Sequence, residues 1–419
     1  MTNNVSELDE ILGFCVELAR QMIISGANLE RVHLAVEVVC KAYSLKDISI
    51  FFLSSYISLG AYDSEGNYSS RQASIPPAGI HLERLKSLNQ LSYKVAEITP
   101  NPKTLKQMLE RAMNVGEYNT LLVLAGRICA MSCLFLIFGG GVRELFPVAA
   151  VTTLMHFLMP ILENSGLDRI VSNALTMCIS SLAALMFVYG GFSNNLPVII
   201  ITISMIVIPG IPLVNAMRNL LCGREINGIL QMLKIFIETM ALGMGMYVAI
   251  ACFGGDALKG AEELTTMTNP VYLVILSYIA SVGFGVVFMI PPKDLWLAGL
   301  GGALARAALV SLTPVTDNRL LYVTLAAMAA ALYAEFLAVT RKQPSTYFVY
   351  PSIIPLIPGD LFFFALAGLY LGDKQGVETN GINCLISLAA LSIGFVLSST
   401  VAHHIRRSHY RGLFSTAHQ

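Results

Sequence analysis

The pattern of hydrophobic positions changes near residue 120. Before that point, apolar residues recur at the spacing of helices that cover a soluble core, as they do over 7–26. After it, they form runs of about 20 residues with few charges, the length that crosses the hydrocarbon core of a bilayer. The pattern therefore predicts a small soluble domain followed by a membrane domain.

The first domain, residues 1–119, combines helical and strand patterns. Asn28 can cap a second helix after the one over 7–26. The stretch 48–62 is rich in β-branched and aromatic residues and predicts a strand, and the turn residues at 63–67 lead to a shorter return strand. Two more helices are predicted near 79–97 and 102–116. We expect a cytoplasmic α+β domain that folds on its own and gates or regulates the membrane domain.

The later apolar runs predict an all-α, polytopic membrane domain of about ten transmembrane helices. They lie near 120–140, 145–163, 171–191, 196–216, 228–253, 271–290, 294–313, 319–340, 346–371 and 381–402. An acidic link at 254–270 separates a first half, 120–253, from a second half, 271–405. A basic tail, 406–419, ends the sequence.

Lysine and arginine residues gather on alternate links between these runs. The richer set of links holds Arg169, Arg218, Arg224, Lys293, Arg341 and Lys342. The poorer set holds Arg143, Lys259, Arg319 and Lys374. Because positive links stay inside, we expect both termini in the cytoplasm and the link 254–270 outside. The N-terminus lacks a signal-peptide pattern, so we expect the chain to begin in the cytoplasm. The expected location is the cell's inner (plasma) membrane, as a multi-pass protein.

Composition narrows the possible functions. Hydrophobic residues make up 55% of the chain and charged residues only 13%, too few for a wholly water-facing surface. Basic and acidic residues number 27 each, so no nucleic-acid partner is expected. The cysteines have no metal-ligand spacing, and neither Gly139–Gly141 nor Ser54-Ser55 belongs to a phosphate-loop or hydrolase motif. We therefore expect no cofactor, no metal and no enzyme activity.

The two halves share landmarks that indicate an internal repeat. Pro209-Gly210 precedes Gly223 by the same interval at which Pro358-Gly359 precedes Gly372. Nearly the same offset aligns Phe138, Arg143, Glu144 and Leu145 with Phe288, Lys293, Asp294 and Leu295. Because each half holds an odd number of spans, the second half enters the membrane from the opposite side. Two inverted five-helix repeats are an architecture of secondary transporters.

Both Pro-Gly pairs fall in the middle of apolar runs, where proline removes a backbone donor and glycine tolerates non-helical geometry. In a membrane, the freed backbone groups need partners from protein, water or a solute. We therefore assign Pro209, Gly210, Pro358 and Gly359, with the nearby Asn215, to a substrate site. There, the N–H groups of a half-helix can face a substrate carboxylate. A pair of packing kinks is the alternative.

Charged residues inside the predicted helices are a second signal, because an unpaired charge is costly there. They include Arg127, Glu238, Arg306, Glu335 and Asp360. Asp360 and Glu335 are candidates for proton binding, since a desolvated carboxylate can titrate near neutral pH. Glu238 is a third candidate, with simple pairing to Lys234 as the alternative. The two arginines can each bind a substrate carboxylate or pair with one of these acids.

Several blocks carry a resemblance to a known family. They are SGANLERV at 25–32, PGIPLVNAMRNLLCG at 209–223 and RKQPSTYFVYPSIIPLIPGD at 341–360. In these blocks the chain resembles the threonine/serine exporters, in a form that fuses two halves found as separate polypeptides in some members. The resemblance implies a cytoplasmic N-terminal domain, ten spans, and export of threonine and serine driven by the proton gradient. The resemblance also implies an acid after the first Pro-Gly pair, where this chain has Asn215, Arg218 and Asn219, so the chain departs from the expected carboxylate proton site in its first half.

The resulting hypothesis is proton-coupled efflux of threonine or serine across the lipid bilayer. Export of a dicarboxylate such as succinate, the activity associated with the two-protein members, is the alternative. A membrane enzyme would need a nucleophile and a base within 1–119, and none is found. A passive channel would be indifferent to neutralisation of its carboxylates. The sequence is also compatible with a homo-oligomer.

Overall fold

The computed structural model describes residues 2–53, 55–76, 79–208, 210–253, 269–341 and 343–415. Its contacts divide the chain into two compact units. The first contains residues 1–118, 288–292 and 337–348, and the second contains 119–287, 293–336 and 349–419. The predicted external link lies outside the described residues except for its last two positions, and so do the side chains of the predicted basic tail.

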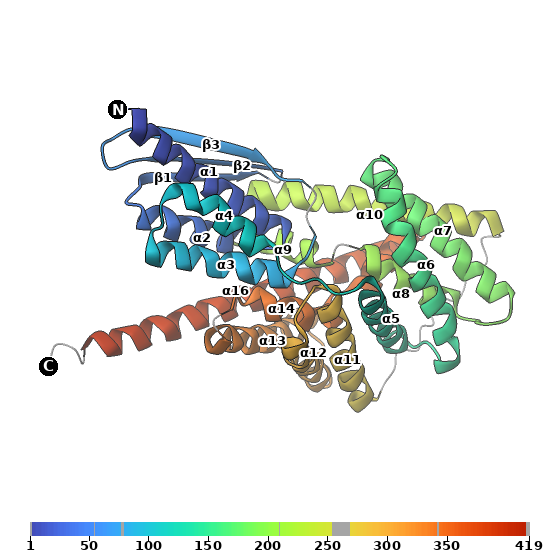
Figure 1. Ribbon diagram of the computed structural model, residues 1–419. Coiled ribbons are helices and arrows are strands. Elements are labelled where there is room, and N and C mark those ends of the chain that lie inside the picture. The colour runs from blue at the N-terminus through green and yellow to red at the C-terminus, as the bar shows by residue number, and fades with distance from the viewer. Residues whose placement is uncertain are drawn as a thin grey trace. The chain divides into compact units, whose positions relative to one another are not determined.

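The first unit is an α+β fold of helices packed beside a small antiparallel sheet (Figure 1). Its elements are α1 (Thr2–Ile24), α2 (Leu29–Ala42), β1 (Lys46–Leu53), β2 (Tyr56–Tyr62), β3 (Tyr68–Ser74), α3 (Leu82–Ile98) and α4 (Pro102–Met113). The strand order is β1-β2-β3, and α1 packs against β2 and β3. Leu12, Leu18 and Met22 of α1 and Ile57 and Leu59 of β2 are almost fully buried and form the core.

The prediction of strands in the first unit was wrong in one respect. The stretch 48–62 is not one strand but most of β1, a tight turn and β2, with Leu53 paired to Tyr56 across the turn. The turn lacks glycine and proline, so the apolar run showed no break there. The next turn agrees with the prediction, because the carboxylate of Asp63 accepts hydrogen bonds from the backbone and the side chain of Asn67, both at 2.8 Å.

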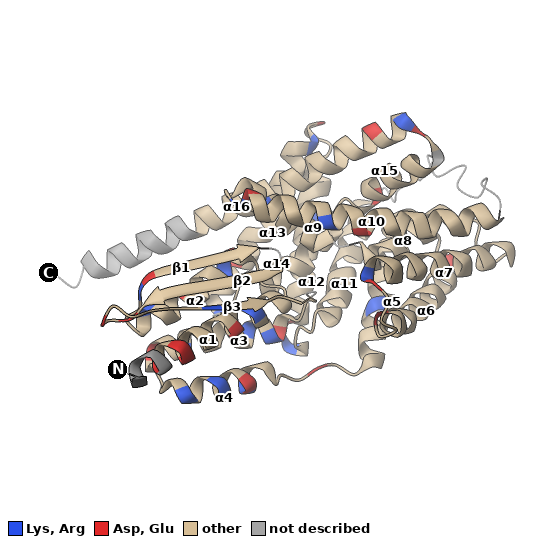
Figure 2. Ribbon diagram, turned by 90° about the horizontal axis from the view of Figure 1, so that it is seen from above, with Lys and Arg blue, Asp and Glu red and all other residues tan. Residues whose placement is uncertain are grey.

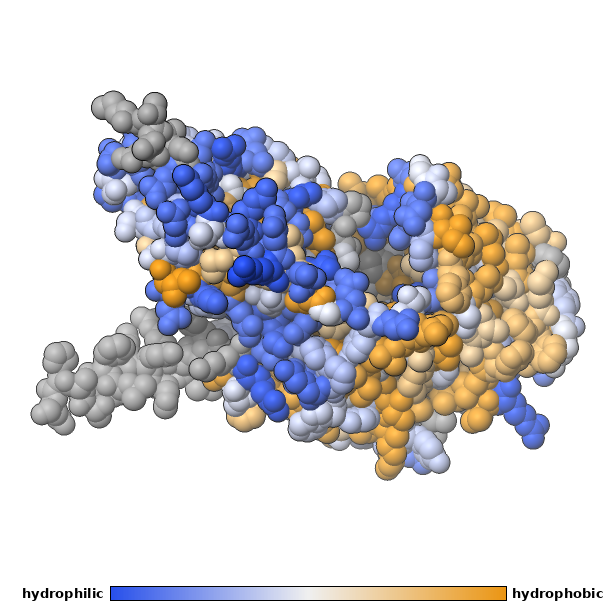
Figure 3. All heavy atoms as spheres, viewed as in Figure 1, coloured by the Kyte–Doolittle hydropathy of each residue, from blue (hydrophilic) through white to orange (hydrophobic). Residues whose placement is uncertain are grey.

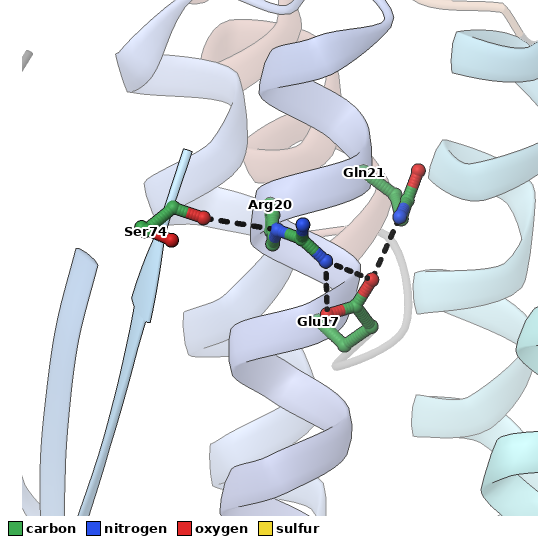
Figure 4. Close-up of polar contacts among 4 residues, drawn as sticks. All are labelled: Glu17, Arg20, Gln21 and Ser74. Carbon is green, nitrogen blue, oxygen red and sulfur yellow. Dashed lines mark hydrogen bonds and ion pairs between the residues drawn. The ribbon is translucent and has the colours of Figure 1, made fainter. Parts of the chain in front are cut away.

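Polar contacts attach α1 to the edge of the sheet (Figure 4). Arg20 Nε donates to the carbonyl of Ser74 in β3 at 3.0 Å. Arg20 Nη1 also lies 3.2 Å from Glu17 Oε1, and Gln21 Nε2 donates to the same carboxylate at 2.7 Å. These contacts fix the last turns of α1 beside β3 and so position the turn that follows.

The SGANLERV block forms that turn, between α1 and α2. Gly26 has a left-handed φ of 95°, which favours glycine. Asn28 accepts the N–H of Arg31 at 2.8 Å and so caps α2, as predicted. The carbonyl of Ser25 accepts the N–H of His81 at 3.1 Å. The block therefore holds His81, the N-cap residue of α3, through this backbone hydrogen bond.

The first unit also holds the turn between the sixth and seventh predicted spans. The N–H of Leu82, at the start of α3, donates to the carbonyl of Phe288 at 2.9 Å. The hydroxyl of Tyr118 donates to the carbonyl of Ile290 at 2.6 Å. Between these carbonyls, Met289 has a left-handed φ of 61°, which is strained for a side chain of this kind. The hydrogen bonds on both sides hold this strained turn in place.

Acidification should destabilise the first turn of α3. His81 is its N-cap, and His81 Nδ1 accepts the N–H of Arg84 at 3.2 Å. Burial, and then the charge of Arg84, lower the pKa of His81 below its usual 6.5, against the opposing effect of Glu117. A depressed pKa contributes stability above pH 6.5 that is lost as the pH falls through the folded value.

We therefore expect the amides of α3 to exchange faster with deuterium at about pH 5 than at about pH 7, after correction for intrinsic rates, in the full-length protein in detergent. His81→Asn keeps a cap that does not titrate and should remove most of this difference. The same pH dependence in both proteins would contradict the assignment.

The described residues after 119 are mostly helical. The helices are α5 (Thr120–Ile137), α6 (Leu145–Glu163), α7 (Arg169–Tyr189), α8 (Leu196–Val207), α9 (Gly210–Leu221), α10 (Glu225–Phe253), α11 (Pro270–Val287), α12 (Pro292–Leu312), α13 (Arg319–Arg341), α14 (Thr346–Ile353), α15 (Gly359–Leu371) and α16 (Lys374–Ser415). Among the described residues, 8 helices are long and apolar enough to cross a membrane, and two bent pairs raise the number to 10. This range includes the predicted number of spans.

The surface of these helices is apolar. Figure 3 shows hydrophobic residues over the region where Figure 1 places α5 to α8 and α11. Figure 2 shows charged residues frequent on α1 to α4 and sparse along α5 to α8. Large exposed side chains include Phe157, Met186, Phe236, Leu300 and Phe336. Soluble proteins rarely expose so much apolar surface, so these side chains face lipid and the chain is a multi-pass membrane protein.

Helices from the two halves meet at glycines. A Cβ added to Gly126 of α5 would lie 3.0 Å from the carbonyl oxygen of Gly283 in α11. A Cβ added to Gly283 would lie 2.6 Å from the carbonyl oxygen of Gly126. The two backbones are therefore in direct contact, which small residues permit in membrane helices.

Gly283→Ala should lower the melting temperature of the detergent-solubilised protein by several degrees. The added methyl group meets rigid backbone, and overpacking of this kind costs about 1–3 kcal/mol. Gly381→Ala is the matched control, because its Cβ would meet only one atom, at 4.0 Å. Equal melting temperatures for the two variants would contradict the close contact of α5 and α11.

Candidate substrate site at two broken helices

Both Pro-Gly pairs interrupt a membrane span, as predicted. The pair α8 and α9 is bent by 62°, and the pair α14 and α15, joined by a short 3₁₀ turn at Ile354–Leu356, is bent by 54°. Pro209 itself lies outside the described residues. In both breaks the glycine N–H donates to the carbonyl two residues earlier, from Gly210 to Ile208 and from Gly359 to Ile357, each at 2.8 Å. The two breaks therefore share one local geometry.

The two breaks touch each other. A Cβ added to Gly210 would lie 3.0 Å from Ile357 Cδ1, and one added to Gly359 would lie 2.0 Å from Met205 Sδ. Each glycine thus faces a side chain of the opposite broken helix, next to or just before its break. The two broken helices cross where their backbones leave helical geometry.

Protein side chains satisfy the backbone groups that the second break frees. The N–H of Gly359 turns back to its own break, so the carbonyl of Pro355 loses its helical partner. Arg306 Nη2 donates to this carbonyl at 2.5 Å, and Arg306 Nε donates to Ser277 Oγ at 3.2 Å. Arg306, predicted as a substrate ligand, therefore lies at the break and braces its backbone.

A carboxylate at the same break interacts with two arginines. Asp360, in the first turn of α15, is half-buried. Its carboxylate accepts hydrogen bonds from the backbone N–H groups of Asp360 and Leu361. It also interacts electrostatically with Arg319 of α13 and Arg306 of α12. Arg319 is the first residue of α13, as the predicted span over 319–340 has it, but its interaction with Asp360 was not predicted.

Side-chain hydrogen bonds connect the first broken helix to its neighbours. Asn215 Nδ2, in α9, donates to the hydroxyl of Tyr350 in α14 at 3.0 Å. The hydroxyl of Ser392 in α16 donates to the carbonyl of Val214 at 3.3 Å. Tyr350 was not singled out in the sequence, although it belongs to the block at 341–360. Asn215 thus links the helix after the first break to the helix before the second.

The other predicted site residues occupy different places. Arg127 of α5 interacts electrostatically with Glu163 of α6. The buried Glu238 of α10, a candidate for proton binding with pairing to Lys234 as the alternative, instead pairs with Arg169 of α7 at 3.8 Å. Glu335 lies toward the end of α13, about 24 Å along the helix from the arginine at its start. The structure therefore gathers Asp360, Arg306 and Asn215 around the breaks but not these three.

A multi-pass helical protein with two broken spans that cross beside a charged cluster has the architecture of a secondary transporter. Residues 13–253 match the family described as "Putative threonine/serine exporter", and residues 273–401 match the family described as "Threonine/Serine exporter, ThrE". A "Probable threonine/serine exporter" of Mycobacterium tuberculosis is 21% identical over 413 residues, which cover 95% of this chain and 77% of that protein. No solved structure matches the chain significantly.

The chain therefore belongs to the threonine/serine exporter family, and the resemblance seen in the sequence is confirmed. Membership makes the protein a membrane exporter rather than a member of an enzyme class. The matched descriptions name threonine and serine, and they give the dicarboxylate alternative no support.

Proposed function

We propose that the protein exports threonine and serine across the cell's inner membrane in exchange for protons. The observation that carries this proposal is the contact between the two breaks beside Asp360. An amino-acid zwitterion carries a positive and a negative group, so its transport site needs protein groups of both charges at a place where the backbone can change shape. Asp360 and the arginines supply the charges, and the two breaks supply the backbone. Asp360 is the group we assign to proton exchange, because a carboxylate kept inside a membrane at high cost normally has a use.

Alternating access follows from an inverted repeat. The equal hydrogen bonds at Gly210 and Gly359, and the similar bends, support two five-helix repeats of opposite orientation. Rocking of one repeat against the other would expose the crossing point first to one side of the membrane and then to the other. The packing-kink alternative leaves the contact between the two breaks without a role.

The proposed orientation places both termini in the cytoplasm. The first unit contains residues 288–292 and 337–348, which lie on links that the lysine and arginine pattern assigned to the cytoplasmic side. Its hydrogen bonds to Phe288 and Ile290 hold the turn just before α12, the helix that carries Arg306. This connection supports a gating or regulatory role for the N-terminal residues.

Transport into inside-out vesicles tests the proposal. With an acidic lumen, vesicles that contain the protein should accumulate labelled threonine, because protons leave as threonine enters. Unlabelled serine should compete with threonine and succinate should not. Dissipation of the pH gradient should stop accumulation. Accumulation that ignores the gradient, or that succinate inhibits as well as serine, would contradict the proposal.

A further inference from the structure

We propose that Arg319 and Asp360 form a clamp for the two charges of the substrate, in which Arg319 binds the carboxylate and Asp360 binds the ammonium group. This inference rests on the proposed function and adds to it a binding residue and the chemical reason for its substrate class. Arg319 and Asp360 come from different helices, α13 and α15, and interact electrostatically beside the second break.

The groups around Asp360 differ in the hydrogen bonds that they already make to other parts of the protein. Arg306 of α12 already donates to Ser277 and to the backbone of the break. The thiol of Cys384 in α16 lies 3.9 Å from the carbonyl of Pro358. Arg319 Nη1 donates to Ser387 Oγ at 3.5 Å, which is long for a hydrogen bond of this type. Of the two arginines near Asp360 in the described part of the chain, Arg319 thus has more of its five N–H donors left for a ligand.

Helix α16 fixes where the Arg319 guanidinium lies. Cys384 of α16 faces the carbonyl of Pro358, and Ser387 of the same helix faces Arg319. These two residues are one turn apart on the same side of α16. The guanidinium therefore lies about one helical turn from the break. Asp360 begins the half-helix on the far side of the same break. The two opposite charges consequently border one short stretch of unwound backbone.

This arrangement selects a zwitterion. The substrate carboxylate can take two parallel hydrogen bonds from a guanidinium, and its ammonium group can donate to the carboxylate of Asp360. Binding replaces the interaction of Arg319 with Asp360 and leaves no charge unpaired. A dicarboxylate would place a second negative charge against Asp360, and an amine would leave Arg319 without an anion.

The clamp also couples substrate to protons. A proton on Asp360 removes the negative charge that balances the ammonium group and so weakens substrate binding, which makes proton and substrate compete for one site. Competition of this kind yields exchange of one for the other across the membrane. The ionisable groups that face Asp360 are Arg306, Arg319 and Cys384, from α12, α13 and α16. We assign the exchanged proton to Asp360 itself.

The test compares threonine with threonine amide, which lacks the carboxylate, in purified full-length protein reconstituted into liposomes. The assay measures exchange of labelled threonine with no pH gradient and the concentration of each compound that half-inhibits it. Arg319→Gln should weaken inhibition by threonine about tenfold or more and leave inhibition by the amide nearly unchanged. Arg319→Lys should fall between this variant and the wild type. Arg143→Gln, which changes an exposed arginine between α5 and α6, should behave as wild type.

An unchanged preference for threonine over its amide in Arg319→Gln would overturn the clamp and leave the proposed function standing. If wild-type protein fails to exchange threonine at all, the proposed function fails, and the clamp fails with it. If Arg319→Gln elutes as an aggregate in size-exclusion chromatography, inhibition by threonine and by its amide is compared in Arg319→Lys instead. Retention of the full wild-type preference in that variant would then overturn the clamp, because lysine cannot bind a carboxylate as a planar fork.

Discussion

Asp360→Asn should abolish threonine export driven by a pH gradient and retain exchange of threonine without a gradient. An asparagine side chain cannot take up a proton, so the gradient loses its point of action. Its amide oxygen can still accept a hydrogen bond from the ammonium group, so the site continues to bind threonine with reduced affinity. The two activities are measured in the same proteoliposomes, with and without an acidic exterior.

Two other carboxylates serve as controls for Asp360. Glu335→Gln changes an acid of α13 that lies far along the helix from Arg319, and Glu238→Gln changes one already paired with Arg169. Both variants should keep gradient-driven export, with smaller losses than Asp360→Asn. Wild-type pH dependence in Asp360→Asn would remove the proton assignment and leave the paired breaks as a substrate site.

Gly359→Val should reduce transport at least tenfold. A Cβ at this position would lie 2.0 Å from Met205 Sδ and 2.3 Å from Met205 Cε, so a branched side chain clashes with Met205 of the opposite broken helix and disturbs the crossing of the two breaks. Because the blocking atoms belong to the end of a flexible methionine, Met205→Ala should restore part of the activity of Gly359→Val. The initial rate of threonine exchange measures both effects.

The rescue distinguishes a local clash from general damage. Gly381→Val, at a glycine with open surroundings, should transport nearly as wild type. If Met205→Ala gives no rescue and simply adds its own loss, the contact between the two breaks does not control transport.

The spans and breaks of this protein could be predicted because each depends on the residues of one short segment of the sequence. Apolar runs report directly on the length of a span, and a proline cannot complete a helical hydrogen bond whatever surrounds it. Asp360 could be singled out for a similar reason, because it follows Pro358-Gly359 within one apolar run.

The partners of the site residues could not be predicted, because they come from other helices. Sequence spacing gives neighbours within one helix, so it suggested Lys234 for Glu238, whereas packing brings Arg169. Arg319 stands at the edge of an apolar run and resembles a link residue, so its interaction with Asp360 of α15 could not be predicted from the sequence. The hydrogen bond between Asn215 and Tyr350 likewise depends on the packing of α9 beside α14.

A disulfide across the two breaks tests the central claim most directly. A Cβ at Gly210 would lie 3.9 Å from the Cβ of Ile357, close to the separation in natural disulfides. Gly210→Cys and Ile357→Cys are combined in a protein whose 8 native cysteines have been replaced. The product is identified by mass spectrometry of the linked peptides, and each single variant is the control. We expect oxidation to form the disulfide and stop threonine exchange, and a reductant to restore it. Failure of the two cysteines to link, or an oxidised protein that exchanges threonine at the rate of the reduced one, would contradict a transport site at the crossing of the two broken helices.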